Sequence, residues 1–312
     1  MNIRNYQPGD ETAQVDVYNT AAARLPNFKP ATVAEIQRRS RARDFDPEQR
    51  IYAVDGGRVV GYGVVNANGR ISYPWCLPGF EHAAEPLFAR MLEAARKRAL
   101  PKVFAAYRAD WPAVHDFFLS RGLARARTVV NFLIEFVDMP TPSDRGSSAI
   151  SPLRPADVPL VYAWMPEALR ADRPEKLHDH LFKNPYFTAD ALFALRDRQG
   201  GPMAAGIVVY DPSYADPQAV DSAMPCFRLG AFGTEGMQTK RLKGLFSFLA
   251  KPNASLSSLA MDLMAHAMYL LREHDDVTGL AGQAATDAPA LLAFYERNFK
   301  KQGSFPVFEM VV

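Results

Sequence analysis

Few side chains in this sequence have the types and spacing that catalysis or metal binding requires. His178 and His180 stand two apart, but residues i and i+2 of a helix point in different directions, so they do not predict a metal site. Cys76 and Cys226 are far apart and lack the spacing of zinc ligands. Tyr295 lies in an amphipathic segment near the C-terminus, where a phenol that is protonated at neutral pH can serve as an acid or simply form the edge of a packed helix.

Other motifs have structural explanations. Gly56-Gly57 and Gly200-Gly201 each precede a strand, so they predict hairpin turns rather than phosphate loops. Asp110 and Asp287 each stand two residues before a proline at a predicted helix start, which predicts capping rather than a catalytic carboxylate pair. Cys76 ends a predicted strand without a nearby histidine, and we interpret it as a small buried side chain.

Three segments occur twice along the chain, which indicates a duplicated unit. The first pair shares a strand, a proline turn and an aspartate. The second shares a Gly-Gly hairpin, and the third shares an Asp-x-Pro-Ala helix start. These pairs are Ile3 to Asp10 with Ile150 to Asp157, Tyr52 to Val65 with Phe193 to Val209, and Asp110 to Phe118 with Asp287 to Tyr295. The second copy is longer, and we place its additional residues mostly between Asp211 and Lys240, which begins with turn-forming residues.

The polar segment 140–148, rich in proline and serine, is the predicted linker between the copies. It divides the chain into a first domain, residues 1–139, and a second, residues 149–312. Each copy has a predicted long helix, Phe80 to Leu100 and Ser258 to Glu273, followed by a strand. A strand, a helix and another strand form a crossover, so the two strands of each pair should be parallel.

Composition excludes several classes of protein. The 312 residues carry a formal net charge of +2 and are 48% hydrophobic, which is typical of a folded chain and too balanced for a nucleic-acid-binding protein. No apolar run is long enough to span a bilayer, and the first residues are polar rather than signal-like. We therefore expect a cytoplasmic protein with no nucleic-acid or membrane partner, and the oligomeric state is open.

The order of elements, with Phe294-Tyr295-Glu296 in the last helix, resembles the GNAT N-acetyltransferase superfamily, in its tandem two-domain form as in mycothiol synthase. The resemblance covers nearly the whole chain and implies an α/β (α+β mixed sheet) fold. Two GNAT-like domains are expected, each a mostly antiparallel sheet with a parallel central strand pair flanked by helices. The second copy replaces the family's Gly-Phe after this motif by Asn298-Phe299, and the first has Phe118 at the tyrosine position.

In this family a loop before the long helix binds the coenzyme A pyrophosphate through backbone amides, because a helix N-terminus offers unpaired N–H donors. The corresponding loop of the first copy contains Glu81, Glu85 and Pro86, which oppose an anion, so we expect an impaired site. The second copy has mostly small residues and a lysine there, although helix capping explains the same residues. The resemblance implies acetyl-CoA binding by Leu249, Ala250, Lys251, Ser255, Leu256, Ser257 and Ser258.

The resemblance also implies that Tyr295 is the acid that protonates the departing thiolate. Phe118 cannot do so, and the second domain is therefore the expected catalytic one. Glu235 is the candidate general base, although an exposed glutamate at a hairpin end explains it equally.

We therefore expect an acyl-CoA-dependent N-acetyltransferase that acetylates a small-molecule or peptide amine and holds no metal. Two alternatives are open: a catalytically inactive tandem GNAT-like interaction or ligand-sensing protein, and another acyl-CoA reaction on the same fold.

Overall fold

The computed structural model describes residues 1–41, 45–139, 149–165, 173–184, 187–210, 242–252, 256–272, 274 and 277–312. The chain forms two compact units, and each takes a segment from the other sequence copy. The first unit contains residues 1–127 and 305–312, and the second contains residues 128–304. The predicted linker, 140–148, and the predicted insertion, 211–240, lie outside the described residues.

The first unit holds a sheet in the order β1-β2-β3-β4, with antiparallel neighbours. Its elements are β1 (Asn2–Asn5), α1 (Asp10–Ala22), α2 (Val33–Ser40), β2 (Arg50–Asp55), β3 (Arg58–Val64), β4 (Trp75–Cys76), α3 (Ala84–Lys97), β5 (Lys102–Ala106) and α4 (Pro112–Leu119). The final strand of the chain, β12 (Lys300–Val311), pairs with β5 through its last residues, so the C-terminus completes this unit.

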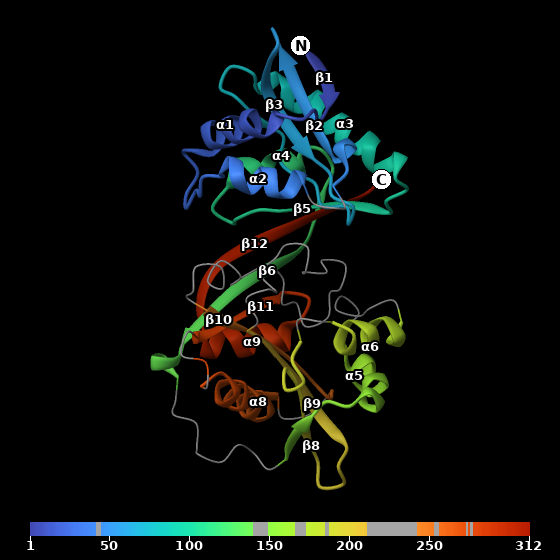
Figure 1. The fold of residues 1–312 in the computed structure, drawn as a ribbon, viewed down its shortest axis with the longest axis vertical. Coiled ribbons are helices and arrows are strands. Elements are labelled where there is room, and N and C mark those ends of the chain that lie inside the picture. The colour runs from blue at the N-terminus through green and yellow to red at the C-terminus, as the bar shows by residue number, and fades with distance from the viewer. Residues whose placement is uncertain are drawn as a thin grey trace. The chain divides into compact units, whose positions relative to one another are not determined.

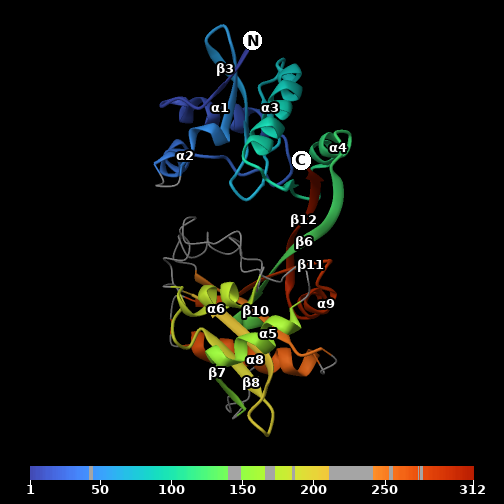
Figure 2. The ribbon, with the colours of Figure 1, turned by 90° about the vertical axis from the view of Figure 1, so that its right-hand side faces the viewer.

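Helices α1 and α3 lie on opposite sides of β3 (Figures 1 and 2). Glycines let α3 approach closely, because a Cβ on Gly63 would stand 2.6 Å from the Met91 sulfur. The predicted hairpin is confirmed: β2 and β3 pair in antiparallel register around Gly56 and Gly57, whose φ angles of 54° and 82° suit glycine.

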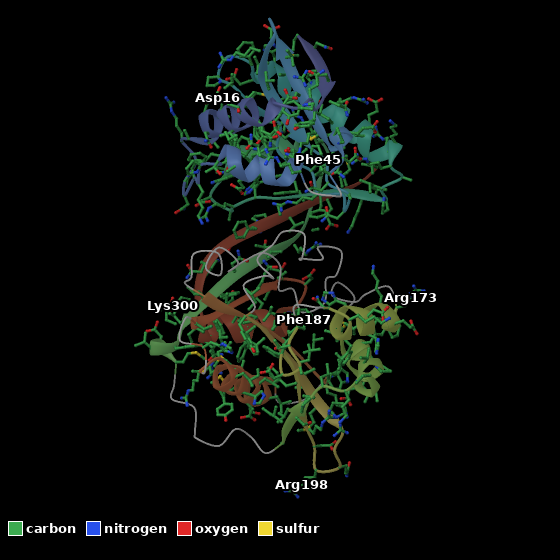
Figure 3. The ribbon with its side chains drawn as sticks, in the orientation of Figure 1. Asp16, Phe45, Arg173, Phe187, Arg198 and Lys300 are labelled. Carbon is green, nitrogen blue, oxygen red and sulfur yellow. The ribbon has the colours of Figure 1, made fainter. Side chains whose placement is uncertain are left out.

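The second unit holds the strand order β6-β11-β10-β9-β8-β7. Its elements are β6 (Ala124–Glu135), β7 (Ile150–Pro152), α5 (Val158–Trp164), α6 (Pro174–Phe182), β8 (Leu192–Arg196), β9 (Pro202–Val209), β10 (Leu242–Ala250), α8 (Leu256–Leu271), β11 (Val277–Ala285) and α9 (Pro289–Asn298). Helices α5 and α6 lie on one side of the sheet and α8 on the other (Figure 1). Arg198 marks the exposed tip of the hairpin between β8 and β9 (Figure 3).

The predicted parallel pair is present in this unit, where β10 and β11 pair in parallel on either side of α8. Helix α8 packs an extended apolar surface on the sheet: Leu263, Ala267 and Leu271 are all buried. In the described part of the chain, no helix has the length and apolar character that crossing a membrane requires.

The repeated aspartates occupy equivalent positions in the two units. Asp10 accepts a hydrogen bond from the Gln7 N–H at 2.7 Å, and Asp157 accepts one from the Arg154 N–H at 2.8 Å. Each carboxylate thus binds the backbone three residues earlier and fixes the proline turn, rather than capping the turn that follows it. Arg196 binds the buried Asp157 carboxylate through both terminal nitrogens, at 2.8 and 3.2 Å.

Candidate active site in the second unit

Strands β10 and β11 diverge in the second unit. Their parallel pairing ends at Leu245 and Ala281. Beyond these residues β10 continues to Ala250 beside β9, while β11 continues to Ala285 beside β6. The two strands therefore share no pairing over their C-terminal halves, and their backbone groups face each other across a wedge.

One edge of β10 is directed into this wedge. The Lys251 N–H donates to the Met203 carbonyl of β9 at 2.8 Å. Because backbone groups alternate in direction along a strand, those of Phe246, Phe248 and Ala250 point the other way, toward β11. Such an edge can hydrogen-bond an extended ligand as a further strand would.

Tyr295 of α9 lies at the apex of the wedge. Its side chain is fully buried and its hydroxyl donates a hydrogen bond to the Phe246 carbonyl at 2.7 Å. The ring lies over Gly282, where a Cβ would stand 2.3 Å from Cε1. Phe132 of β6 stacks on the ring with centroids 5.4 Å apart. A glycine in β11 is therefore what lets the phenol reach the strand edge.

Burial raises the pKa of Tyr295 well above its usual range, and the nearby Ser247 hydroxyl offsets only part of this effect. The phenol is therefore protonated at every physiological pH, as an acid requires. The Ser247 side chain is 1% exposed, and its Oγ has no hydrogen-bond partner among the described residues.

Two amides lie on the opposite face of the same strands. Since Gly282 faces Tyr295, the next residue, Gln283, points to the other side of the sheet. Its Nε2 donates to Oδ1 of Asn131 in β6 at 2.9 Å. Asn131 is only 8% exposed, and Gln283 is half-buried. The Ser247 side chain leaves β10 on this same face, because its neighbours Phe246 and Phe248 pack toward Phe294 of α9, and its hydroxyl comes close enough to the wedge to lower the pKa of Tyr295.

The predicted phosphate-binding residues lie just beyond the wedge. Leu249 is buried in the core, Ala250 is half-buried at the end of β10, and Lys251 is exposed. Ser258 is exposed in the first turns of α8, whose backbone begins with Leu256 and Ser257. Ser255 lies outside the described residues, as does Glu235, the predicted base.

In the equivalent loop of the first unit, a backbone N–H of the loop binds a carboxylate side chain of the same loop. Glu81 accepts a hydrogen bond from the Gly79 N–H at 3.0 Å. Hydrogen bonds from its own N–H and from that of Gly79 lower the pKa of this carboxyl group. The side chain thus occupies backbone donors that an anion would need.

The matching strands in the first unit also part, but aromatic side chains fill the space. Among the described residues, the segment before β4 meets β5 in parallel at a single bridge, between Arg70 and Phe104. Further along, the Tyr73 N–H donates to the Tyr107 hydroxyl at 2.6 Å. Phe118 is fully buried and stacks on Tyr107, with centroids 5.9 Å apart. Phe118 carries no hydroxyl group, so the first unit has no counterpart of the Tyr295 phenol at this position.

Other predicted residues have structural surroundings. The capping prediction for Asp110 is wrong, because helix α4 has Trp111 at its N-cap and the Asp110 carboxylate accepts from Arg108 and Asn27 instead. His178 and His180 face different rings, those of Phe182 and Phe187. Phe187 is labelled in Figure 3.

Neither the protein-family models nor the curated proteins gave a match. A GCN5-related N-acetyltransferase from Sphaerobacter thermophilus is similar in structure, with a TM-score of 0.64 and 15% identity, covering 99% of this chain and 95% of the other. The tandem GNAT protein of the clavulanic acid biosynthesis pathway, solved without AcCoA, is similar over 99% of this chain and 98% of its own, with a TM-score of 0.56 and 16% identity.

This chain has the tandem GNAT fold. The predicted fold class is thereby confirmed, and the parallel central pair flanked by helices is present in the second unit. A GCN5-related glucosamine N-acetyltransferase region in a fungal multi-domain GH3 β-N-acetylglucosaminidase is also similar, with a TM-score of 0.63 and 16% identity over 99% of this chain and 38% of that protein.

The sequence reasoning missed three polar residues of this GNAT-fold site: Ser247, Gln283 and Asn131. A signal for one of them was present, since Asn131 interrupts the apolar run from Val129 to Ile134. Its place in the second unit could not be read from the sequence, because it precedes the linker and belongs to the first copy.

Proposed function

We propose that the second unit is an acyl-CoA-dependent N-acyltransferase that transfers an acetyl group from acetyl-CoA to an amine. The observation that supports this most is the wedge between β10 and β11 with the Tyr295 hydroxyl at its apex. The backbone edge of Phe248 and Ala250 that faces away from β9 offers hydrogen bonds to the amide groups of a pantetheine chain. Beyond it, Lys251 offers a positive charge, and the start of α8 offers the positive end of a helix dipole for phosphates.

The proposed reaction is direct attack of a neutral amine on the thioester carbonyl. The C–N bond forms, the C–S bond breaks, and the coenzyme A thiolate takes a proton. Tyr295 donates that proton, and the proton lost by the amine restores the phenol, so the transfer balances. The hydroxyl now donates to the Phe246 carbonyl. A thiolate is a stronger acceptor than a carbonyl, because it carries a full charge.

The first unit does not share this role in our proposal. Glu81 occupies loop amides, Tyr107 occupies the Tyr73 N–H, and Phe118 replaces the phenol. Acetyl-CoA is therefore expected at one site per chain, in the second unit.

An inactive ligand-sensing protein is the second candidate. The observation that favours it is that Tyr295 is completely buried and its hydroxyl already donates a hydrogen bond to a backbone carbonyl. Both features are typical of a tyrosine in a protein core.

Release of coenzyme A from acetyl-CoA, detected with a thiol reagent, separates these candidates when the wild type is compared with Tyr295→Phe. If the protein is an acyltransferase, we expect amine-dependent release of coenzyme A by the wild type. The variant should lose about 100-fold or more in kcat while it still binds acetyl-CoA. A variant that turns over as fast as the wild type would refute the role of Tyr295. Acetyl-CoA binding without release in any amine would favour the sensing protein.

A further inference from the structure

The amide pair formed by Gln283 and Asn131 has no part in the coenzyme A site proposed above. It lies on the face of β11 opposite Tyr295, next to the point where β10 and β11 separate. Both side chains are held in the sheet, since Gln283 and Asn131 are directly paired in the antiparallel register of β11 and β6.

The hydrogen bond between the two amides leaves one acceptor atom and one donor atom unused. Gln283 uses Nε2 as the donor and Asn131 uses Oδ1 as the acceptor, at 2.9 Å. Gln283 Oε1 and Asn131 Nδ2 have no other hydrogen bond among the described residues. Ser247 adds a buried hydroxyl that reaches the wedge beside the Tyr295 phenol, and its Oγ makes no close hydrogen bond with another described residue. A polar side chain that is 1% exposed and unpaired costs stability unless a ligand or another group completes it.

We propose that Gln283, held by Asn131, positions the acceptor amine on this face of the wedge, and that Ser247 completes its hydrogen bonds. This inference rests on the proposed function. Gln283 Oε1 accepts an N–H of the amine, which leaves the nitrogen lone pair directed at the thioester carbonyl. An uncharged acceptor also suits a neutral amine, the form that attacks, because a carboxylate there would stabilise the unreactive ammonium.

The neighbouring side chains on this face narrow the substrate class. Val129 and Leu133 flank Asn131 on β6, and Ala285 follows Gln283 on β11. By strand alternation these apolar residues share the face of the amide pair. They favour a primary amine carried on an uncharged molecule over an amine surrounded by carboxylates or phosphates.

Asn131 also makes the site depend on both sequence copies. It lies in β6, before residues 140–148, whereas Gln283 and Ser247 come after them. A chain beginning at residue 149 would contain Tyr295 but lack this positioning group.

The test compares Gln283→Leu with the wild type in the full-length protein. Three primary amines, tyramine, glucosamine and glycinamide, serve as acceptors, and coenzyme A release is measured as amine and acetyl-CoA are varied. Loss of the hydrogen bond should raise the amine KM about 10-fold or more, while the KM for acetyl-CoA stays unchanged. Asn131→Leu should act similarly, and the double variant should be no worse than either single one.

Gln199→Leu is the matched control, because it makes the same change at an exposed hairpin residue and should leave the amine KM unchanged. Amine-dependent release by the wild type together with an unchanged amine KM in Gln283→Leu would overturn this assignment and leave the proposed function standing. Failure of the proposed function is distinguishable, because the wild type itself would then show no amine-dependent release with any of the three amines.

Discussion

Gly282→Ala is expected to disturb the site without touching the phenol itself. The added Cβ would stand 2.3 Å from Cε1 of Tyr295, 2.6 Å from Cζ and 2.9 Å from the hydroxyl oxygen. Carbon atoms in contact prefer about 3.5 to 4.0 Å, so the ring has to move by roughly 1 Å. Its hydrogen bond to the Phe246 carbonyl, now 2.7 Å, would then be lost.

Two costs add in this variant. Overpacking a buried site costs about 1 to 3 kcal/mol, and leaving a buried carbonyl unsatisfied costs a similar amount. We therefore expect the free energy of unfolding to fall by about 2 to 6 kcal/mol, measured by urea denaturation. A double variant with Tyr295→Phe should lose less than the sum of the single variants, because the same hydrogen bond is removed by both.

Gly201→Ala is the control for adding a methyl group to a glycine. Its nearest neighbour would be the Asp197 carboxylate at 3.1 Å, in an exposed hairpin where the side chain can move. The expected change in stability is below about 0.5 kcal/mol. If Gly282→Ala were as stable as this control, the placement of Tyr295 over β11 would be refuted.

Two further predictions concern ionisable groups, one in each unit. Burial alone would raise the pKa of Asp157, but hydrogen bonds from Arg196 and the Arg154 N–H outweigh it, so the folded-state pKa is lowered. The ionised Asp157 therefore stabilises the fold above its unfolded pKa of about 4, and this stabilisation is lost as the pH falls below that value. The Asp157→Asn variant should lower the free energy of unfolding at pH 7 and make urea denaturation depend less on pH in the acid range. Burial raises the pKa of Cys76 to about 12, so in a Cys226→Ser background the native protein should react with a thiol reagent at pH 8 far more slowly than the urea-unfolded chain. Equal rates would contradict the half-buried placement of this thiol.

Much of the fold followed from local sequence signals. The Gly-Gly hairpins are read correctly because a two-residue turn with positive φ requires glycine, as Gly56 and Gly57 show. The long helices were also predicted within a few residues, since Pro101 follows the first and α8 has a continuous apolar surface. These features depend on neighbouring residues alone.

Long-range pairing is what the sequence did not reveal. The last residues of β12 pair with β5, and β6 pairs with β11, so each unit is completed by a strand from the other copy. Strand pairing depends on partners far along the chain, and duplicated sequences offer two similar partners for each edge. Asn131 was consequently overlooked as a residue of the second unit.

The site was likewise predicted only in part. Tyr295 was identified from its motif, but its contact with Gly282 depends on the register of α9 against β11, which no motif encodes. Glu81 was predicted to repel a pyrophosphate; the structure adds that its carboxylate binds the Gly79 N–H directly.

The central claim is that acetyl-CoA binds in the second unit, and thermal unfolding with the coenzyme tests it most directly. At about 100 times its dissociation constant, acetyl-CoA should stabilise the native protein by roughly 2.7 kcal/mol. Lys251→Glu should greatly reduce this shift, whereas Lys301→Glu, the same charge change on an exposed residue of β12, should keep it. No shift in the wild type, or an equal shift in both variants, would contradict the account.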